Sequence, residues 1–208
     1  MSTALLICNA EKPGRWLQQY AQKADFILAA DGGADAALAA GIMPSAVIGD
    51  LDSVSLRARR LLKDTPFIHV TRQDNTDLEK ALDFLVAQHF EQCIIAGATG
   101  GRLDFTLGNI LAIRPYVTKI NLSFQDKNWA LYPVTQTLTL PAKKGARLSL
   151  LPLNKCRGVT LTGCKYPLTK ENLTGRQIGR TLSNQVSAPQ ISVSLTSGLL
   201  LLYIETNI

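Results

Sequence analysis

The chain has 208 residues, of which 46% are hydrophobic and 18% charged, as is typical of a globular protein with a buried core. It has no apolar stretch near the ~20 residues of a membrane helix, and its start, "MSTALLICNA", lacks the basic segment of a signal peptide. We therefore expect a cytoplasmic protein with no membrane partner. The net charge of +6 is concentrated in residues 136–208, which carry nine basic and two acidic residues. This excess of positive charge could bind nucleic acid or an anionic small substrate. Aromatic residues are not interleaved with the basic ones, which favours the small substrate over nucleic acid.

The first part of the chain alternates apolar, strand-like runs with helical patterns. Strands are expected at 4–8, 26–30, 46–48, 67–70, 93–96 and 120–124. Helices are expected to open at Pro13, to span 34–41, and to follow Ser53, Thr76 and Asp104. Thr76 and Glu79 have the spacing of a capping box. This order predicts an α/β domain over 1–125, with a mainly parallel, Rossmann-like sheet covered on both faces.

From about residue 136 the pattern changes to short runs that alternate apolar and polar residues. These runs span 136–140, 146–151, 158–163, 190–195 and 199–205, with no convincing helical window. They predict an all-β domain over 126–208, a sandwich or a barrel-like unit. Residues 125–135 are expected to join the two domains. The apolar "LLLLYI" of so small a sheet suggests that a second subunit covers part of it.

The cysteines and histidines do not form a recognisable metal site. Cys8, Cys93, Cys156 and Cys164 have no C-x-x-C spacing, which indicates buried free thiols. Only two histidines are present. Ligands for a metal would therefore be carboxylate oxygens, which favour Mg²⁺ or Mn²⁺.

Polar clusters follow four of the predicted strands. Asp31, the pair Asp50 and Asp52, the pair Asp74 and Asp77, and the segment 97–104 all come just after an apolar run. Open α/β sheets bind ligands at the carboxyl ends of their strands. The clusters are therefore expected to share one crevice.

Two clusters point to a cation and a nucleotide. If "GDLDS" stays extended, Asp50 and Asp52 project to one side, where two close carboxylates recruit a cation. The alternative is a turn at Asp50 with Asp52 or Ser53 capping the next helix. In "ADGGAD", Gly32 and Gly33 would let the backbone approach a nucleotide, or would belong to a turn and a helix cap.

The other two clusters could contribute to a phosphate-binding site. In "QDNTD", Asp77 falls in the first turn of a helix and can face the crevice, although the segment could serve only as an N-cap. "GATGGRLD" offers N–H groups, a hydroxyl and a guanidinium through Thr99, Gly100, Gly101 and Arg102. It matches neither the P-loop nor the dinucleotide motif, and a plain turn is the alternative.

The order of the motifs resembles the thiamine pyrophosphokinase family, also called thiamine diphosphokinases. The motifs are "DGGAD", "PSAVIGDLDSV", "QDNTDLEKAL", "GATGGRLDFTLGN", "TGCKYPLT" and "GRTLSNQV". The resemblance implies a homodimer whose α/β domain binds ATP and Mg²⁺ and whose β domain binds thiamine and dimerises. Thiamine would lie at the subunit interface.

The resemblance also implies roles for individual residues. Asp50, Asp52 and Asp77 would hold the metal, while Ser183 and Asn184 would meet thiamine. Gln73, Thr76 and Arg102 would contact phosphate or substrate, and Asp31 and Asp104 would line the same site. Together with the clusters above, the residues expected to bind ATP and its phosphates are Asp31, Gly32, Gly33, Gln73, Thr76, Thr99, Gly100, Gly101 and Arg102. The expected catalytic residues are Asp77, Arg102 and Asp104. The chain departs from the family at Phe105, where a histidine is common, and at Gln185–Val186.

The expected reaction is an in-line attack of the thiamine hydroxyl on the β-phosphorus of MgATP, which releases AMP. Such transfers need mainly positioning and charge neutralisation, and Asp77 or Asp104 could accept the proton. Two alternatives stay open. One is transfer to another hydroxymethyl heterocycle such as a pterin, and the other is a non-catalytic nucleotide or nucleic-acid binding module.

Overall fold

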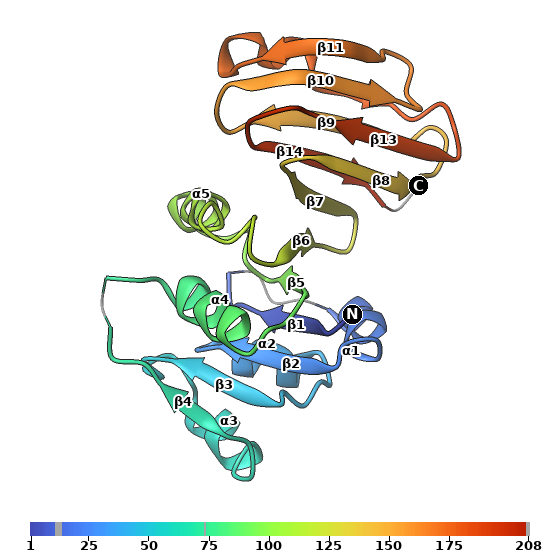
Figure 1. Cartoon of the computed structure of the whole chain (residues 1–208). Coiled ribbons are helices and arrows are strands. Elements are labelled where there is room, and N and C mark those ends of the chain that lie inside the picture. The colour runs from blue at the N-terminus through green and yellow to red at the C-terminus, as the bar shows by residue number, and fades with distance from the viewer. Residues whose placement is uncertain (11–13, 73, 207–208) are drawn as a thin grey trace. The chain divides into compact units, whose positions relative to one another are not determined.

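The computed structural model describes residues 1–10, 14–72 and 74–206. The chain divides into two compact units, Met1–Lys127 and Asn128–Ile208, which are treated separately below (Figure 1). Among the described residues, no helix is both long and apolar enough to cross a membrane. All four cysteines are buried free thiols, as predicted.

The first unit is built on a parallel sheet. Its strands lie in the order β6-β5-β1-β2-β3-β4, and every neighbouring pair is parallel. The bounds are β1 Thr3–Ile7, β2 Phe26–Ala30, β3 Ala46–Gly49, β4 Phe67–His69, β5 Gln92–Ala96 and β6 Asn121–Gln125. The chain builds outward from β1 to β4 and then returns to the other side of β1. The carboxyl ends of β1 and β5 therefore form a topological switch point, where such sheets bind ligands.

Helices cover both faces of this sheet, as predicted (Figure 1). They are α1 Gln18–Ala21, preceded by a 3₁₀ turn at Arg15–Leu17, then α2 Gly33–Ala39, α3 Leu56–Leu61, α4 Asp77–Ala87 and α5 Leu103–Ala112. Ile27 and Ala29 of β2 face the cores formed with α2. Phe26 points to the opposite face and contacts Phe84 of α4, because neighbouring side chains of a strand alternate.

Local sequence signals explain where the helices begin. The capping box of α4 is present, since the Glu79 N–H donates to the Thr76 hydroxyl and the Thr76 N–H donates to the Glu79 carboxylate. Ser55, and neither Asp52 nor Ser53, caps α3 by accepting from the Ala58 N–H at 3.0 Å. Pro13 lies outside the described residues.

The second unit consists of two antiparallel sheets. One has the order β12-β9-β14-β7 and the other β11-β10-β13-β8. The bounds are β7 Trp129–Val134, β8 Thr137–Pro141, β9 Arg147–Pro152, β10 Cys156–Thr162, β11 Leu168–Leu173, β12 Asn184–Gln185, β13 Gln190–Ser194 and β14 Leu200–Glu205. Leu148 and Leu150 of one sheet share a buried core with Val159, Leu161 and Val193 of the other. The predicted all-β sandwich is confirmed.

The join predicted within residues 125–135 lies there, since the two units meet between Lys127 and Asn128, but the strands on either side extend into this stretch. Gln125 closes β6, and Trp129–Val134 form β7, which pairs with β14. The aromatic and branched residues of β7 favour a strand. Strand β11 was missed because its sequence, "LTKENL", has mostly exposed or half-exposed side chains and hence no apolar alternation. Residues 128–206 contain one short 3₁₀ helix, Gly175–Arg180, and no α-helix.

Gly33 provides a test of how closely α2 packs on β1. A Cβ at this position would lie 2.0 Å from the Ile7 carbonyl oxygen, and a backbone atom of a central strand cannot easily move away. We expect Gly33→Ala to lower the free energy of unfolding by about 1 to 3 kcal/mol. Chemical denaturation measures this change.

Gly108 is the matched control, because it lies in α5 and a Cβ there meets nothing within 4 Å. Gly108→Ala should therefore stabilise the protein by about 0.5 to 1 kcal/mol. Equal effects of the two substitutions would contradict the close packing of α2 on β1.

Candidate active site

Three aspartates converge at one edge of the parallel sheet. Asp31 follows β2, Asp50 follows β3, and Asp77 is the first residue of α4. Each offers one carboxylate oxygen, and these oxygens lie within 4.8 Å of one another. We call Asp31, Asp50 and Asp77 the aspartate triad. Because β2 and β3 are parallel neighbours, their carboxyl ends deliver the first two side chains to the same place.

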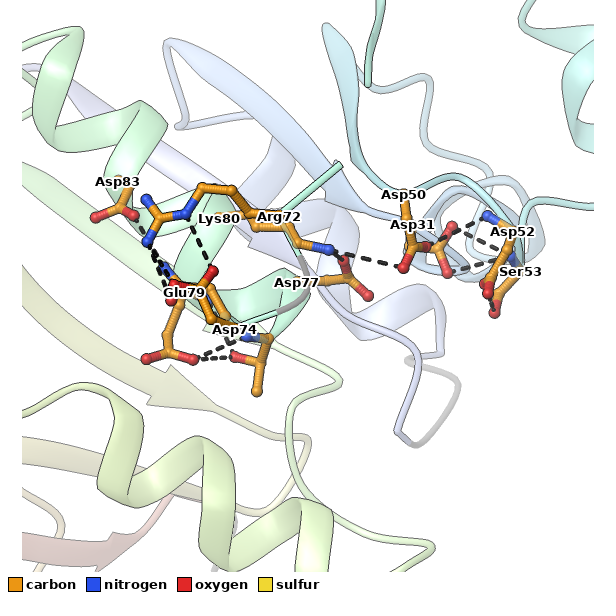
Figure 2. A network of polar contacts seen from close by, with 12 residues as sticks. Asp31, Asp50, Asp52, Ser53, Arg72, Asp74, Asp77, Glu79, Lys80 and Asp83 are labelled. Carbon is orange, nitrogen blue, oxygen red and sulfur yellow. Dashed lines mark hydrogen bonds and ion pairs between the residues drawn. The ribbon is translucent and has the colours of Figure 1, made fainter. Parts of the chain in front are cut away.

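A buried lysine lies against the triad. The Lys80 ammonium donates to Asp77 Oδ1 at 2.9 Å and lies 3.7 Å from Asp50 Oδ2 (Figure 2). Burial by itself lowers the pKa of Lys80, but the hydrogen bond to Asp77 and the charges of Asp77 and Asp50 outweigh it and raise that pKa. Lys80 is therefore a fixed positive charge.

Asp31 is the most buried member of the triad, with 5% of its surface exposed. Burial raises the pKa of its carboxyl, hydrogen bonds from Ser53 and Gly32 partly offset this, and the charge of Asp77 adds to the rise. A Cβ on Gly49 would lie 3.0 Å from Asp31 Cβ and 3.1 Å from Asp77 Oδ1. The glycine of "GDLDS" therefore leaves room for two carboxylates to meet.

The extended geometry expected for Asp50 and Asp52 was wrong. Leu51 lies between them with a φ of 67°, which breaks the alternation of an extended segment. Asp52 is exposed and outside the triad, where its carboxylate accepts from Ser53 Oγ at 2.9 Å. Asp31, which was expected only to contact ATP, is instead the third member of the aspartate triad. A metal-ligand role for Asp52 stays a prediction.

A pocket of about 300 Å³ adjoins the triad at the switch point of the sheet. It is lined by Cys8, Asn9, Ala10, Ala30, Asp31, Gly32, Ser53, Thr76, Asp77, Leu78, Arg102, Phe105 and Asn109. Five predicted site residues therefore share one hollow: Asp31, Gly32, Thr76, Asp77 and Arg102. Gly33 does not line it, and the close packing of α2 on β1 accounts for that glycine.

The glycines of "GATGGRLD" have structural partners. The Gly100 N–H donates to Thr106 Oγ1 at 3.1 Å, and a Cβ on Gly101, whose φ is 61°, would lie 2.8 Å from the Ala10 carbonyl oxygen. Thr99 is half-buried. None of the three lines the pocket, so their contacts with phosphate stay predictions.

Arg102 and Asp104 are exposed and bind each other. The Arg102 Nε donates to Asp104 Oδ1 at 3.1 Å, and the guanidinium lies 4.4 Å from the Phe105 ring centre. The hydrogen bond from Arg102 lowers the pKa of Asp104, which makes its carboxylate a weak base while the pair holds. The pair with Asp104 uses the Nε and Nη2 groups of the exposed Arg102, and a guanidinium has further N–H donors that can reach a phosphate.

The residues expected to meet thiamine lie in the second unit. The Ser183 N–H donates to Ser149 Oγ at 3.1 Å. Asn184 is buried, accepts from the Tyr166 and Gln185 N–H groups, and donates to the Tyr166 carbonyl oxygen at 2.7 Å. Its amide is thus committed to local structure, so a thiamine contact stays a prediction. Gln73 lies outside the described residues.

Several polar residues of this site were not predicted from the sequence, namely Asn9, Ser53, Lys80 and Asn109. Lys80 was detectable, since it lies three residues after Asp77 and therefore on the same side of the helix. Asn109 lines the pocket and donates to the Ala98 carbonyl oxygen at 2.7 Å. No local sequence pattern identifies Asn109, because it lies inside α5, six residues after the start of the helix and away from the loop that precedes it.

An acidic cluster beside a pocket, at the switch point of a parallel sheet, is typical of enzymes that bind phosphate-bearing ligands with a divalent cation. Comparison with known proteins makes the class specific. Residues 17–124 match the model of the thiamin pyrophosphokinase catalytic domain, and residues 135–200 match that of the thiamin pyrophosphokinase vitamin B1 binding domain. The chain belongs to the thiamin pyrophosphokinase family.

Individual relatives agree with this assignment. The chain is 32% identical over 200 residues to a thiamine pyrophosphokinase of Bacillus subtilis, covering 92% of each protein. A crystal structure of thiamine pyrophosphokinase from Bacillus subtilis superposes with a TM-score of 0.86 at 26% identity over both full chains. One from Geobacillus thermodenitrificans gives 0.84 at 26% identity, covering 100% of this chain and 98% of the other. The predicted family, fold class and enzyme class are confirmed.

Asp31 provides a test of strain within the triad. Because burial disfavours its charged form, Asp31→Asn should raise the free energy of unfolding of the metal-free protein by about 0.5 to 2 kcal/mol. The same change should lower turnover by about 100-fold or more. Denaturation in EDTA and a steady-state assay measure the two effects.

Asp64→Asn, at an exposed aspartate of the same unit, is the control for loss of one negative charge. It should change neither quantity. A less stable Asp31→Asn protein would show that Asp31 supports the fold rather than straining it.

Proposed function

We propose that the triad and the adjoining pocket are the Mg²⁺ and ATP site of a thiamine pyrophosphokinase. The enzyme transfers pyrophosphate from ATP to the hydroxyl of thiamine and so forms thiamine diphosphate and AMP. The observation that carries this proposal is the convergence of Asp31, Asp50 and Asp77 beside the pocket. The family match over both units supports the reaction and its acceptor.

The donor set suits the metal. Three carboxylate oxygens within 4.8 Å of one another are hard ligands of the kind that Mg²⁺ and Mn²⁺ prefer. Asp52 is a proposed fourth ligand, because its exposed carboxylate can rotate towards Asp50. A bound ion would neutralise phosphate charge and orient the pyrophosphoryl group.

The chain's own residues then have separable roles. Lys80 holds Asp77 and Asp50 from the buried side. Gly32 lines the pocket and lets the end of β2 approach Asn9, whose Nδ2 would lie 2.5 Å from a Cβ at this position. Arg102, at the start of α5, turns from Asp104 to the phosphates and places a positive charge where negative charge develops. Its departure removes the hydrogen bond that lowers the pKa of Asp104. Asp104 is then free to accept the thiamine proton.

We also propose that the second unit binds thiamine through Ser183 and Asn184 and forms a homodimer. The match of residues 135–200 to a vitamin B1 binding domain supports thiamine binding by this unit. The dimer rests on the resemblance of the motifs to the family. The apolar residues of β14 do not support it, because they are already buried within the chain.

The acceptor is tested by incubating the purified protein with ATP and Mg²⁺ and either thiamine or 6-hydroxymethylpterin. We expect AMP and thiamine diphosphate to form in equal amounts with thiamine, and no AMP above background with the pterin. EDTA should abolish the reaction, and added Mn²⁺ should restore it. AMP formation with the pterin alone would favour the other heterocycle, and no ATP turnover at all would favour a binding module.

The triad is tested by Asp77→Asn, which removes one ligand charge but keeps the size of the side chain. We expect turnover to fall by about 100-fold or more, while the melting temperature shows that the protein remains folded. Asp64→Asn again serves as control. Near-normal turnover of Asp77→Asn over a range of Mg²⁺ concentrations would refute the metal site.

A further inference from the structure

Lys80 approaches the triad from the side opposite to solvent. Its side chain is 4% exposed, whereas those of Asp50 and Asp77 are 33% and 34% exposed. Its neighbours on α4, Leu78, Ala81 and Leu82, are all buried. The ammonium is thus held under the carboxylates by helix packing, and an ion from solvent must reach them from the exposed side.

This placement has two opposite effects. Without metal, Lys80 relieves the repulsion between Asp50 and Asp77, which would otherwise push the two carboxylates apart. A divalent cation on the same carboxylates meets an ammonium that is already bound to them, and like charges at such short range repel strongly in a half-buried site. Lys80 should therefore preserve the shape of the triad and weaken its hold on a metal ion.

We infer that Lys80 is a resident counter-ion that makes divalent-metal binding depend on the nucleotide. The triad by itself holds the ion weakly, and the phosphates of ATP supply the further negative ligands that secure it. The inference rests on the proposed function, since it assumes that the triad is the metal site. Binding linkage is reciprocal, so the nucleotide in turn binds tightly only with the metal.

Lys80→Met tests this directly, because it keeps the packed stem and removes the charge. The probe is Mn²⁺, whose free concentration is followed by electron paramagnetic resonance without nucleotide. We expect Lys80→Met to bind Mn²⁺ at least about tenfold more tightly than wild type. With a non-hydrolysable ATP analogue present, the difference should shrink to about threefold or less, because phosphate charge then dominates the site.

Two further variants separate charge from structure. Lys80→Arg keeps the charge and should stay within about twofold of wild type without nucleotide. Lys63→Gln removes a positive charge from an exposed lysine on the same unit and should also leave Mn²⁺ affinity unchanged. If Lys80 only filled space, Lys80→Met would bind Mn²⁺ no more tightly than Lys80→Arg.

Stability gives a second readout. In EDTA, Lys80→Met should melt at a lower temperature than wild type. When Mn²⁺ replaces the EDTA, the melting temperature of the variant should rise more than that of wild type, because at equal ligand concentration the tighter complex gains more stability. This comparison works even for a variant too unstable to titrate at room temperature. Equal or weaker Mn²⁺ binding by Lys80→Met in both measurements would overturn the inference. Failure of the wild type to bind Mn²⁺ even with the ATP analogue would instead overturn the proposed metal site.

Discussion

Electrostatic repulsion among Asp31, Asp50 and Asp77 is the constraint around which the first unit is organised. Their oxygens lie within 4.8 Å of one another, and burial raises the pKa of Asp31. A chain selected only for stability would separate these groups or replace them. The proposed metal ion would explain their convergence, and without it the ammonium of Lys80 offsets part of the repulsion between Asp50 and Asp77.

The parallel sheet makes the convergence possible. Neighbouring parallel strands end at the same edge, so β2 and β3 bring Asp31 and Asp50 together although 18 residues of sequence lie between them. Gly49 lacks the side chain that would separate Asp31 from Asp77. The capping box fixes the start of α4 at Asp77 and places Lys80 one turn later. Backbone topology, one glycine and one helix cap thus determine the geometry.

These particulars show what the sequence alone could predict. Strand ends, the capping box and the order of the motifs depend on local patterns, and they correctly placed Asp31, Asp50 and Asp77 near one crevice. The side to which Asp52 points depends on a single backbone angle at Leu51, which no apolar pattern encodes. Strand β11 has mostly polar, exposed side chains, so only its pairing with β10 reveals it. Asn109 reaches the pocket through the packing of α5, which is a tertiary property.

The distribution of charge around the pocket also limits what it can bind. Its walls include the carboxylates of Asp31 and Asp77, and its guanidinium, Arg102, is already paired with Asp104. Such walls repel a bare polyphosphate, because negative charge lies on both sides of the contact. A metal–nucleotide complex reverses this balance, since the cation meets the carboxylates and the phosphates can draw Arg102 from Asp104. If the proposed function holds, the same carboxylates disfavour free phosphate compounds, and selectivity for the metal-bound form follows from the charges of the site rather than from its shape.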